Sequence, residues 1–219
     1  MNEKNFSMSE ALKFGWKTFE ENVGFFIFLI IVLGGTYISL GYLQSFFEKD
    51  GGMLGFMVWL ASVIIQMIIG MGLIKISLKF CDKQKARFED LLEPINLFIP
   101  YLLGSILYAL IVMGGMILLI IPGIIWAVKF GLFSYGIIDR KLDSIESLKF
   151  SSKVTQGVKW NLFLFWLLCA LINFAGALML GVGLFITAPV TMIAYAYVYR
   201  KLAAQTPEFN GPEVQNAAN

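Results

Sequence analysis

The sequence has no histidine, only two cysteines and few charged residues. Histidine is the commonest general base and metal ligand near neutral pH, so its absence removes that chemistry from the chain. Cys81 and Cys169 lie far apart, and they therefore match neither a zinc-binding motif nor a disulfide framework. We expect no catalytic residue, no cofactor and no metal site, and hence no enzyme.

Charged residues make up 15% of the 219 residues, whereas an average soluble domain has about a quarter. Hydrophobic residues make up 58%, and the mean hydropathy is +0.75. A net charge of +2 is too small to indicate a nucleic-acid partner. This composition predicts an integral membrane protein whose surroundings are membrane lipids.

The apolar residues fall into six segments separated by short polar connections. Crossing a hydrocarbon core of about 30 Å takes roughly 20 apolar residues in a helix. The predicted spans are about residues 23–47, 53–78, 99–120, 124–138, 160–180 and 184–199. The fold class is therefore all-α, a polytopic membrane protein with residues 1–202 as one six-span domain. The polar residues 203–219 are predicted to form a disordered cytoplasmic tail.

Residues 124–138 are short for a span, and charge decides their assignment. If they cross, most of the 17 lysines and arginines lie on one side, as the positive-inside rule requires. If they do not cross, the basic residues from Arg140 to Lys159 fall on the wrong side. We therefore predict six crossings of a bacterial inner membrane with both termini cytoplasmic. Lys75 and Lys79, near the cytoplasmic end of a span, are expected to snorkel.

An amphipathic helix is predicted over residues 8–22. Ser7 and Glu10 have capping-box spacing. Apolar residues recur every three or four positions on one face: Leu12, Trp16, Phe19 and Val23. Such a helix, leading directly into a span, is expected to lie on the cytoplasmic surface of the membrane.

A possible internal repeat links this helix to a later segment. ALKFGWK at residues 11–17 matches SLKFSSK at residues 147–153 at four positions, and Asp143 and Glu146 have the spacing of a second helix cap. The middle segment ARFEDLL also precedes a pair of spans, although its match is poor. The chain then reads as three units, each a surface helix followed by a helical hairpin. Duplication and chance similarity both explain a match this short.

Lys129 is the candidate contact for a ligand or a lipid, because it is the ionisable residue deepest in a predicted span. It either faces a polar cavity or reaches out to lipid phosphate and backbone carbonyls. Helix breaks or turns are expected at two places, where proline and glycine cluster. These positions are Pro122 and Gly123 in the third hairpin connection, and Gly181, Gly183 and Pro189 in the last hairpin.

Four segments resemble a known family: EALKFGW at residues 10–16, IPGIIWAVKFGLFSYGIID at 121–139, GVKW at 157–160 and AYAYVYRKL at 194–202. The chain is similar to the membrane domain of some glycerophosphoryl diester phosphodiesterases and to related stand-alone bacterial membrane proteins of unknown function. The resemblance implies an integral membrane protein and places Pro122, Gly123 and Lys129 in its most characteristic stretch. It does not imply hydrolysis, because this chain lacks the soluble barrel with its metal-binding acids and histidines.

Two functions remain open from the sequence. The first is a non-enzymatic membrane protein with a lipid-interacting, structural or scaffolding role, for which a membrane or cytoplasmic protein is the possible partner. The second is a small permease or exporter with a pathway near Lys129. Its other polar residues within the spans would be Gln66, Ser105, Ser134 and Asn173.

Overall fold

The computed structural model describes residues 4–48, 52–179 and 181–206, and within these ranges every regular element is helical. The elements in chain order are α1 (Met8–Glu21), α2 (Val23–Glu48), α3 (Met53–Cys81), the 3-10 helices η1 (Phe88–Leu91) and η2 (Glu93–Leu97), α4 (Phe98–Leu118), α5 (Ile120–Phe130), α6 (Phe133–Arg140), α7 (Ser144–Val154), α8 (Lys159–Leu178) and α9 (Leu184–Ala204). The predicted all-α class is thus confirmed.

Five segments in the described ranges are long and apolar enough to cross a membrane. They are Val23–Phe47, Met53–Cys81, Phe88–Leu118, Ile120–Arg140 and Lys159–Leu178. The sixth predicted span, 184–199, forms most of α9 but is not among them. A multi-pass membrane protein accounts for these five segments, because so much exposed apolar surface needs hydrocarbon around it.

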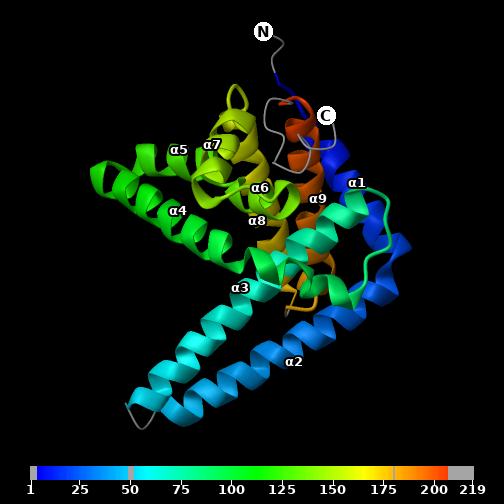
Figure 1. Cartoon of the computed structure of the whole chain (residues 1–219). Helices are drawn as coiled ribbons and strands as arrows, with labels where there is room; N and C mark the ends of the chain where they lie inside the picture. Colours follow the sequence, from blue (N-terminus) through cyan, green and yellow to red (C-terminus); the bar gives the residue numbers. More distant parts are fainter. Residues whose placement is uncertain (1–3, 49–51, 180, 207–219) are drawn as a thin grey trace, which may run out of the picture.

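The chain is arranged as three helical hairpins, each preceded by a short helical segment (Figure 1). The hairpins are α2 with α3, α4 with α5 and α6, and α8 with α9, and the preceding segments are α1, η1 with η2, and α7. In the view of Figure 1 the first hairpin extends to the lower left and the second to the left. The middle segment was expected to resemble the amphipathic helix 8–22, but Pro94 at its second turn and a close contact with α3 leave it as two 3-10 helices.

α6, α9 and the second half of α3 lie inside the protein, whereas one side of α2, α4 and α8 faces outward. α9 packs against α1, α3 and α8, and α3 also contacts α6. Inner isoleucines on α3, α6 and α9 are 0% exposed, namely Ile76, Ile137 and Ile193. Apolar side chains on α2, α4 and α8 are at least half exposed, namely Ile27, Leu103 and Leu171.

Each short segment packs on the inner helix of a different hairpin. α1 lies along α9, η1 and η2 lie along α3, and α7 lies along α6. Glycines permit the first two contacts at backbone distance: a β-carbon at Gly15 would come within 2.3 Å of the Val190 carbonyl oxygen, and one at Gly72 within 2.3 Å of the Leu91 carbonyl oxygen. Any larger residue at either position would push α1 away from α9, or η1 away from α3.

The buried face of α1 coincides only in part with the predicted apolar face. Ser7 caps the helix as expected, since its hydroxyl accepts a hydrogen bond from the Glu10 amide. The residues buried against the protein are Ala11, Gly15, Thr18 and Phe19, whereas Trp16 is 48% exposed. Phe19 of the predicted apolar face is thus buried, and the small residue Gly15 lies directly against α9.

The fourth predicted span is a broken helix. α4 and α5 are joined at Leu119, whose backbone is extended, and α5 begins at Ile120. Pro122 and Gly123 therefore lie in the first turn of α5, where proline costs little because its missing N–H has no helical partner. The chain leaves helical geometry again between α5 and α6, at residues 131–132.

The last hairpin turns at the predicted glycines. Gly181 has φ +77°, a conformation that favours glycine, and Gly183 precedes the first residue of α9. Pro189 is buried and lies inside α9, and the helix continues on both sides of it. Of the predicted tail, residues 203 and 204 belong to α9, and residues 207–219 lie outside the described residues.

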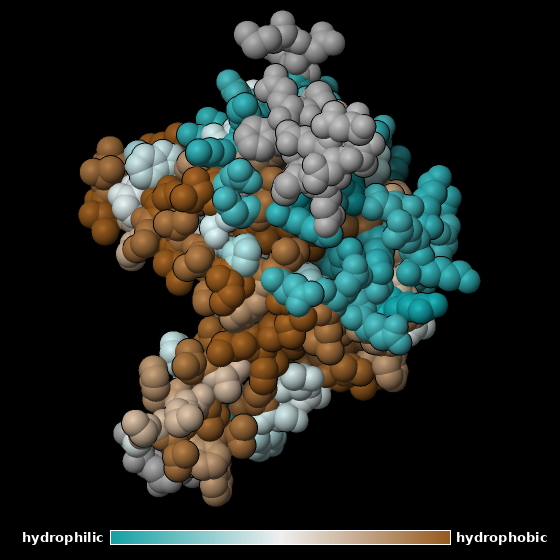
Figure 2. Space-filling model, viewed as in Figure 1, coloured by the Kyte–Doolittle hydropathy of each residue, from teal (hydrophilic) through white to brown (hydrophobic). Residues whose placement is uncertain are grey.

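Polar and apolar residues occupy different regions of the surface (Figure 2). Hydrophilic residues gather over α1 and over the connection between α3 and η1, and the ends of the first two hairpins are largely hydrophobic. This separation is what a protein with one polar surface and membrane-embedded hairpins requires.

Candidate functional site

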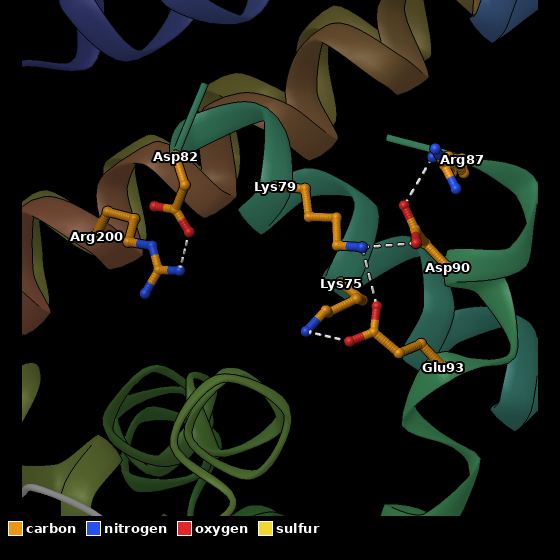
Figure 3. Close-up of polar contacts among 7 residues, drawn as sticks. All are labelled: Lys75, Lys79, Asp82, Arg87, Asp90, Glu93 and Arg200. Carbon is orange, nitrogen blue, oxygen red and sulfur yellow. Dashed lines mark hydrogen bonds and ion pairs between the residues drawn. The ribbon is translucent and has the colours of Figure 1, made fainter. Parts of the chain in front are cut away.

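The inner helices meet in a charged junction at their polar ends, and Arg200 of α9 connects them. Its guanidinium donates one hydrogen bond to Asp82, which follows the last residue of α3, at 2.5 Å. A second, at 2.6 Å, reaches Asp139 near the end of α6. Figure 3 shows the contact with Asp82. One cation thus joins the ends of three helices through two carboxylates.

Aromatic residues hold Asp139 and Arg200 in place. The Tyr199 hydroxyl donates a 2.7 Å hydrogen bond to the same Asp139 oxygen that Arg200 contacts. The Tyr199 ring is 0% exposed and stacks on Tyr135 of α6, with ring centroids 4.9 Å apart. The Asp139 side chain is only 14% exposed, so the contacts with Tyr199 and Arg200 offset the cost of burying its carboxylate.

A second group of charges fastens η1 and η2 to α3 (Figure 3). Lys79 contacts Asp90 at 2.6 Å and Glu93 at 3.0 Å, and Lys75 contacts Glu93 at 2.7 Å. Asp90 also accepts a 2.7 Å hydrogen bond from the Arg87 amide, which closes the turn before η1. Two lysines are therefore matched by two carboxylates.

The pairing corrects the expectation that Lys75 and Lys79 snorkel to the membrane surface. The connection after α3 folds back over the helix, so carboxylates from residues 90 and 93 come to the lysines. Spacing within α3 alone could not reveal partners that lie 11 or more residues further on. A sign was present in the sequence, because Asp90 and Glu93 are three residues apart and follow the most basic stretch.

Both groups of paired charges hold elements of the fold together. Among the described residues, no group of three or more His, Cys, Asp or Glu side chains is placed to hold a metal ion. Cys81 lies beside the junction, and its thiol faces the Ile193 carbonyl at 4.0 Å. The role of the junction that these contacts support is to position three helix ends relative to one another.

Lys129 lies in the last turn of α5, half-buried, with its ammonium 4.9 Å from the centroid of the Phe130 ring. A cation is favourable at this end of a helix. The backbone carbonyl of Lys129 accepts hydrogen bonds from Ser151 and Thr155 of α7, each at 3.0 Å. Lys129 therefore lies directly beside α7.

The other residues proposed for a permeation pathway are not gathered around Lys129 by any contact in the described chain. Gln66 is exposed on α3. Ser105 donates to the Tyr101 carbonyl within α4, and Asn173 donates to Thr191, which links α8 to α9 at 3.0 Å. Ser134 is half-buried in α6. Two of the four therefore have hydrogen bonds to other groups of the protein.

Comparison with known proteins relates the chain to uncharacterised mycobacterial proteins. One from Mycobacterium bovis is 23% identical over 90% of this chain and 69% of its own length. Two from strains of Mycobacterium tuberculosis are 23% and 22% identical over the same shares. No family model matches the chain, and no solved structure matches it.

Proposed function

We propose that this chain is a non-enzymatic, six-span inner-membrane protein with a lipid-interacting, structural or scaffolding role. The observation that carries the proposal is the junction around Arg200, where one guanidinium joins the ends of three inner helices through two carboxylates. A permeation pathway or an active site needs polar groups that are free to bind a substrate, whereas this junction binds helix to helix.

Six crossings follow if α9 is counted with the five apolar segments. α9 is less apolar because it is enclosed by α1, α3 and α8, and a helix surrounded by protein needs no lipid-facing side chains. Its 21 residues are enough to cross. Arg140, Lys149, Lys159 and Arg200 then lie on one side, which we assign to the cytoplasm together with both termini.

The three-unit plan gains support from the packing of α1 and α7. At matching repeat positions Ala11 and Ser147 are both buried, and Lys13 and Lys149 are both exposed. We propose that the units derive from a common ancestor and that the family is that of the phosphodiesterase membrane domains, whose characteristic stretch is the broken helix of α5 and α6.

Cysteine accessibility tests the topology. In a variant whose own cysteines are replaced by serine, Val182→Cys is expected to react with an impermeant maleimide on intact cells, because Val182 is 64% exposed in the turn between α8 and α9. Lys149→Cys is expected to react only after the cells are opened. Labelling of Lys149→Cys in intact cells would overturn the six-span arrangement. The predicted far-side residue Lys49 lies outside the described residues.

The break between α5 and α6 favours one alternative, a small permease or exporter with a pathway near Lys129. Broken helices beside an intramembrane charge occur at transporter binding sites. Under this alternative, Lys129→Met abolishes substrate flux while expression stays normal. Under the main proposal it changes no flux, and its effects are confined to lipid contact.

A further inference from the structure

A hollow lies between the second half of α1 and the connection that follows α3. Its volume is about 560 Å³. Three lysines line it: Lys17 from α1, and Lys83 and Lys85 from the connection. Glu21 is the only carboxylate among the lining residues, so the hollow has an excess of two positive charges. Both segments belong to the hydrophilic region of the surface (Figure 2).

The lysines of this hollow differ from those that fasten η1 and η2 to α3. Lys75 and Lys79 each contact a carboxylate at 3.0 Å or less. Lys17 reaches Glu21 only at 3.8 Å, and both side chains are more than 60% exposed, so this pair contributes little. No hydrogen bond or ion pair joins the side chains of Lys83 and Lys85 to other described residues.

The floor of the hollow is aromatic. Phe14 and Phe80 line it beside the lysines. Phe80 packs against Phe25 and Phe26 at the start of α2, with ring centroids 5.6 and 5.2 Å apart. On the outer side of α2, Phe28 is 52% exposed. Phe88 contacts both Phe25 and Phe28, with ring centroids 5.0 and 4.6 Å apart, so the aromatic floor is connected to the exposed apolar side of the first hairpin.

We propose that this hollow binds the phosphate headgroup of an anionic phospholipid, with Lys83 and Lys85 as its main contacts and Lys17 at its rim. Lysine stems lie along apolar surface and direct their ammonium groups to the membrane boundary, where phosphates are. The acyl chains lie against the exposed side of α2. A phosphate in solution offers the same charge but has no use for this apolar surface, which is why the lipid is the assigned ligand. The inference rests on the membrane insertion proposed above and names the site of the lipid interaction.

Native mass spectrometry of the full chain in detergent micelles measures the affinity directly. Phosphatidylglycerol is expected to bind more tightly than phosphatidylcholine, and Lys83→Gln with Lys85→Gln is expected to weaken phosphatidylglycerol binding about 25-fold, since each lysine near an anionic surface contributes about five-fold. Lys149→Gln with Lys159→Gln removes the same charge elsewhere on the same side and should change binding less than about two-fold. Glu21→Gln should tighten it, a gain that a misfolded variant cannot give.

Three results would overturn the site. They are equal binding of the two lipids, equal losses in the test and control pairs, and competition by soluble glycerol phosphate at the same concentration as the lipid, which would reassign the hollow to a free phosphate. Failure of the proposed membrane insertion is distinguished by extraction of cell membranes with alkaline carbonate. A chain released by carbonate contradicts insertion, whereas a retained chain with unchanged lipid preference contradicts only this site.

Discussion

At the scale of single residues, Arg200 shows why a guanidinium and not an ammonium joins the helix ends. Its two terminal nitrogens point to different carboxylates, Asp82 and Asp139, at 2.5 and 2.6 Å. A planar fork with several donors supports two such contacts at once. Removing it leaves Asp139 enclosed with the Tyr199 hydroxyl as its one remaining hydrogen-bond partner among the described residues.

We expect Arg200→Gln to destabilise the protein by about 2 kcal/mol, less than for a fully buried pair because Arg200 is 30% and Asp82 38% exposed. The measurement is thermal unfolding in detergent, followed by a thiol-reactive dye that reports exposure of Cys169. Lys201→Gln, at an exposed neighbouring position, is the control and should leave the melting temperature within about 1 °C. Equal melting temperatures for the two variants would show that the junction does not hold the helix ends.

At the scale of elements, the break between α5 and α6 depends on hydroxyls from α7. Ser151 accepts a hydrogen bond from the Leu132 amide at 3.0 Å and donates to the Lys129 carbonyl. Thr155 donates to the same carbonyl. Backbone groups freed by a helix break inside a membrane protein need partners of this kind. The surface segment α7 therefore stabilises the interrupted span.

Replacing Ser151 by alanine should lower stability by about 1–2 kcal/mol, because the Leu132 amide loses its acceptor in a buried position. Ser152→Ala, in the same helix and half-buried, is the matched control. Hydrogen exchange at residues 129–133 should increase in the first variant and not in the second. Unchanged exchange in Ser151→Ala would mean that the break is supported from elsewhere.

At the scale of the whole molecule, α9 lies near the centre of the protein and packs against α1, α3 and α8. Ala194 is 0% exposed where α1 crosses α9, and Gly15 of α1 lies against the same part of the helix. On the opposite side of α9, Ala188 is exposed. Small residues therefore make the contact between α1 and α9, as expected when helices pack without a hydrophobic driving force between them.

Ala194→Leu is expected to destabilise the protein by about 3 kcal/mol, since the added atoms must separate α1 from α9. Ala188→Leu adds the same atoms on the exposed side and should change stability by less than about 0.5 kcal/mol. Size-exclusion chromatography and thermal unfolding of the two variants check this difference. If both variants behave alike, α1 is not packed on α9 in the membrane.

The sequence by itself determined the helical class, the membrane environment, and the caps of α1 and α7. These features depend on composition and on residues close together in the chain, such as Ser7 with Glu10 and Asp143 with Glu146. Five of the six apolar segments are recognised for the same reason, because length and hydropathy are local properties.

Only the tertiary structure decided which charges meet and which faces are inside. Arg200 and Asp82 are 118 residues apart, and no periodicity relates them. Likewise, the large apolar residues of α1 recur with helical period, but its contact with α9 depends on the absence of a side chain at Gly15. The predicted surface helix is therefore also an internal packing element, since in a membrane protein the small residues, and not the most apolar ones, mark where helices touch.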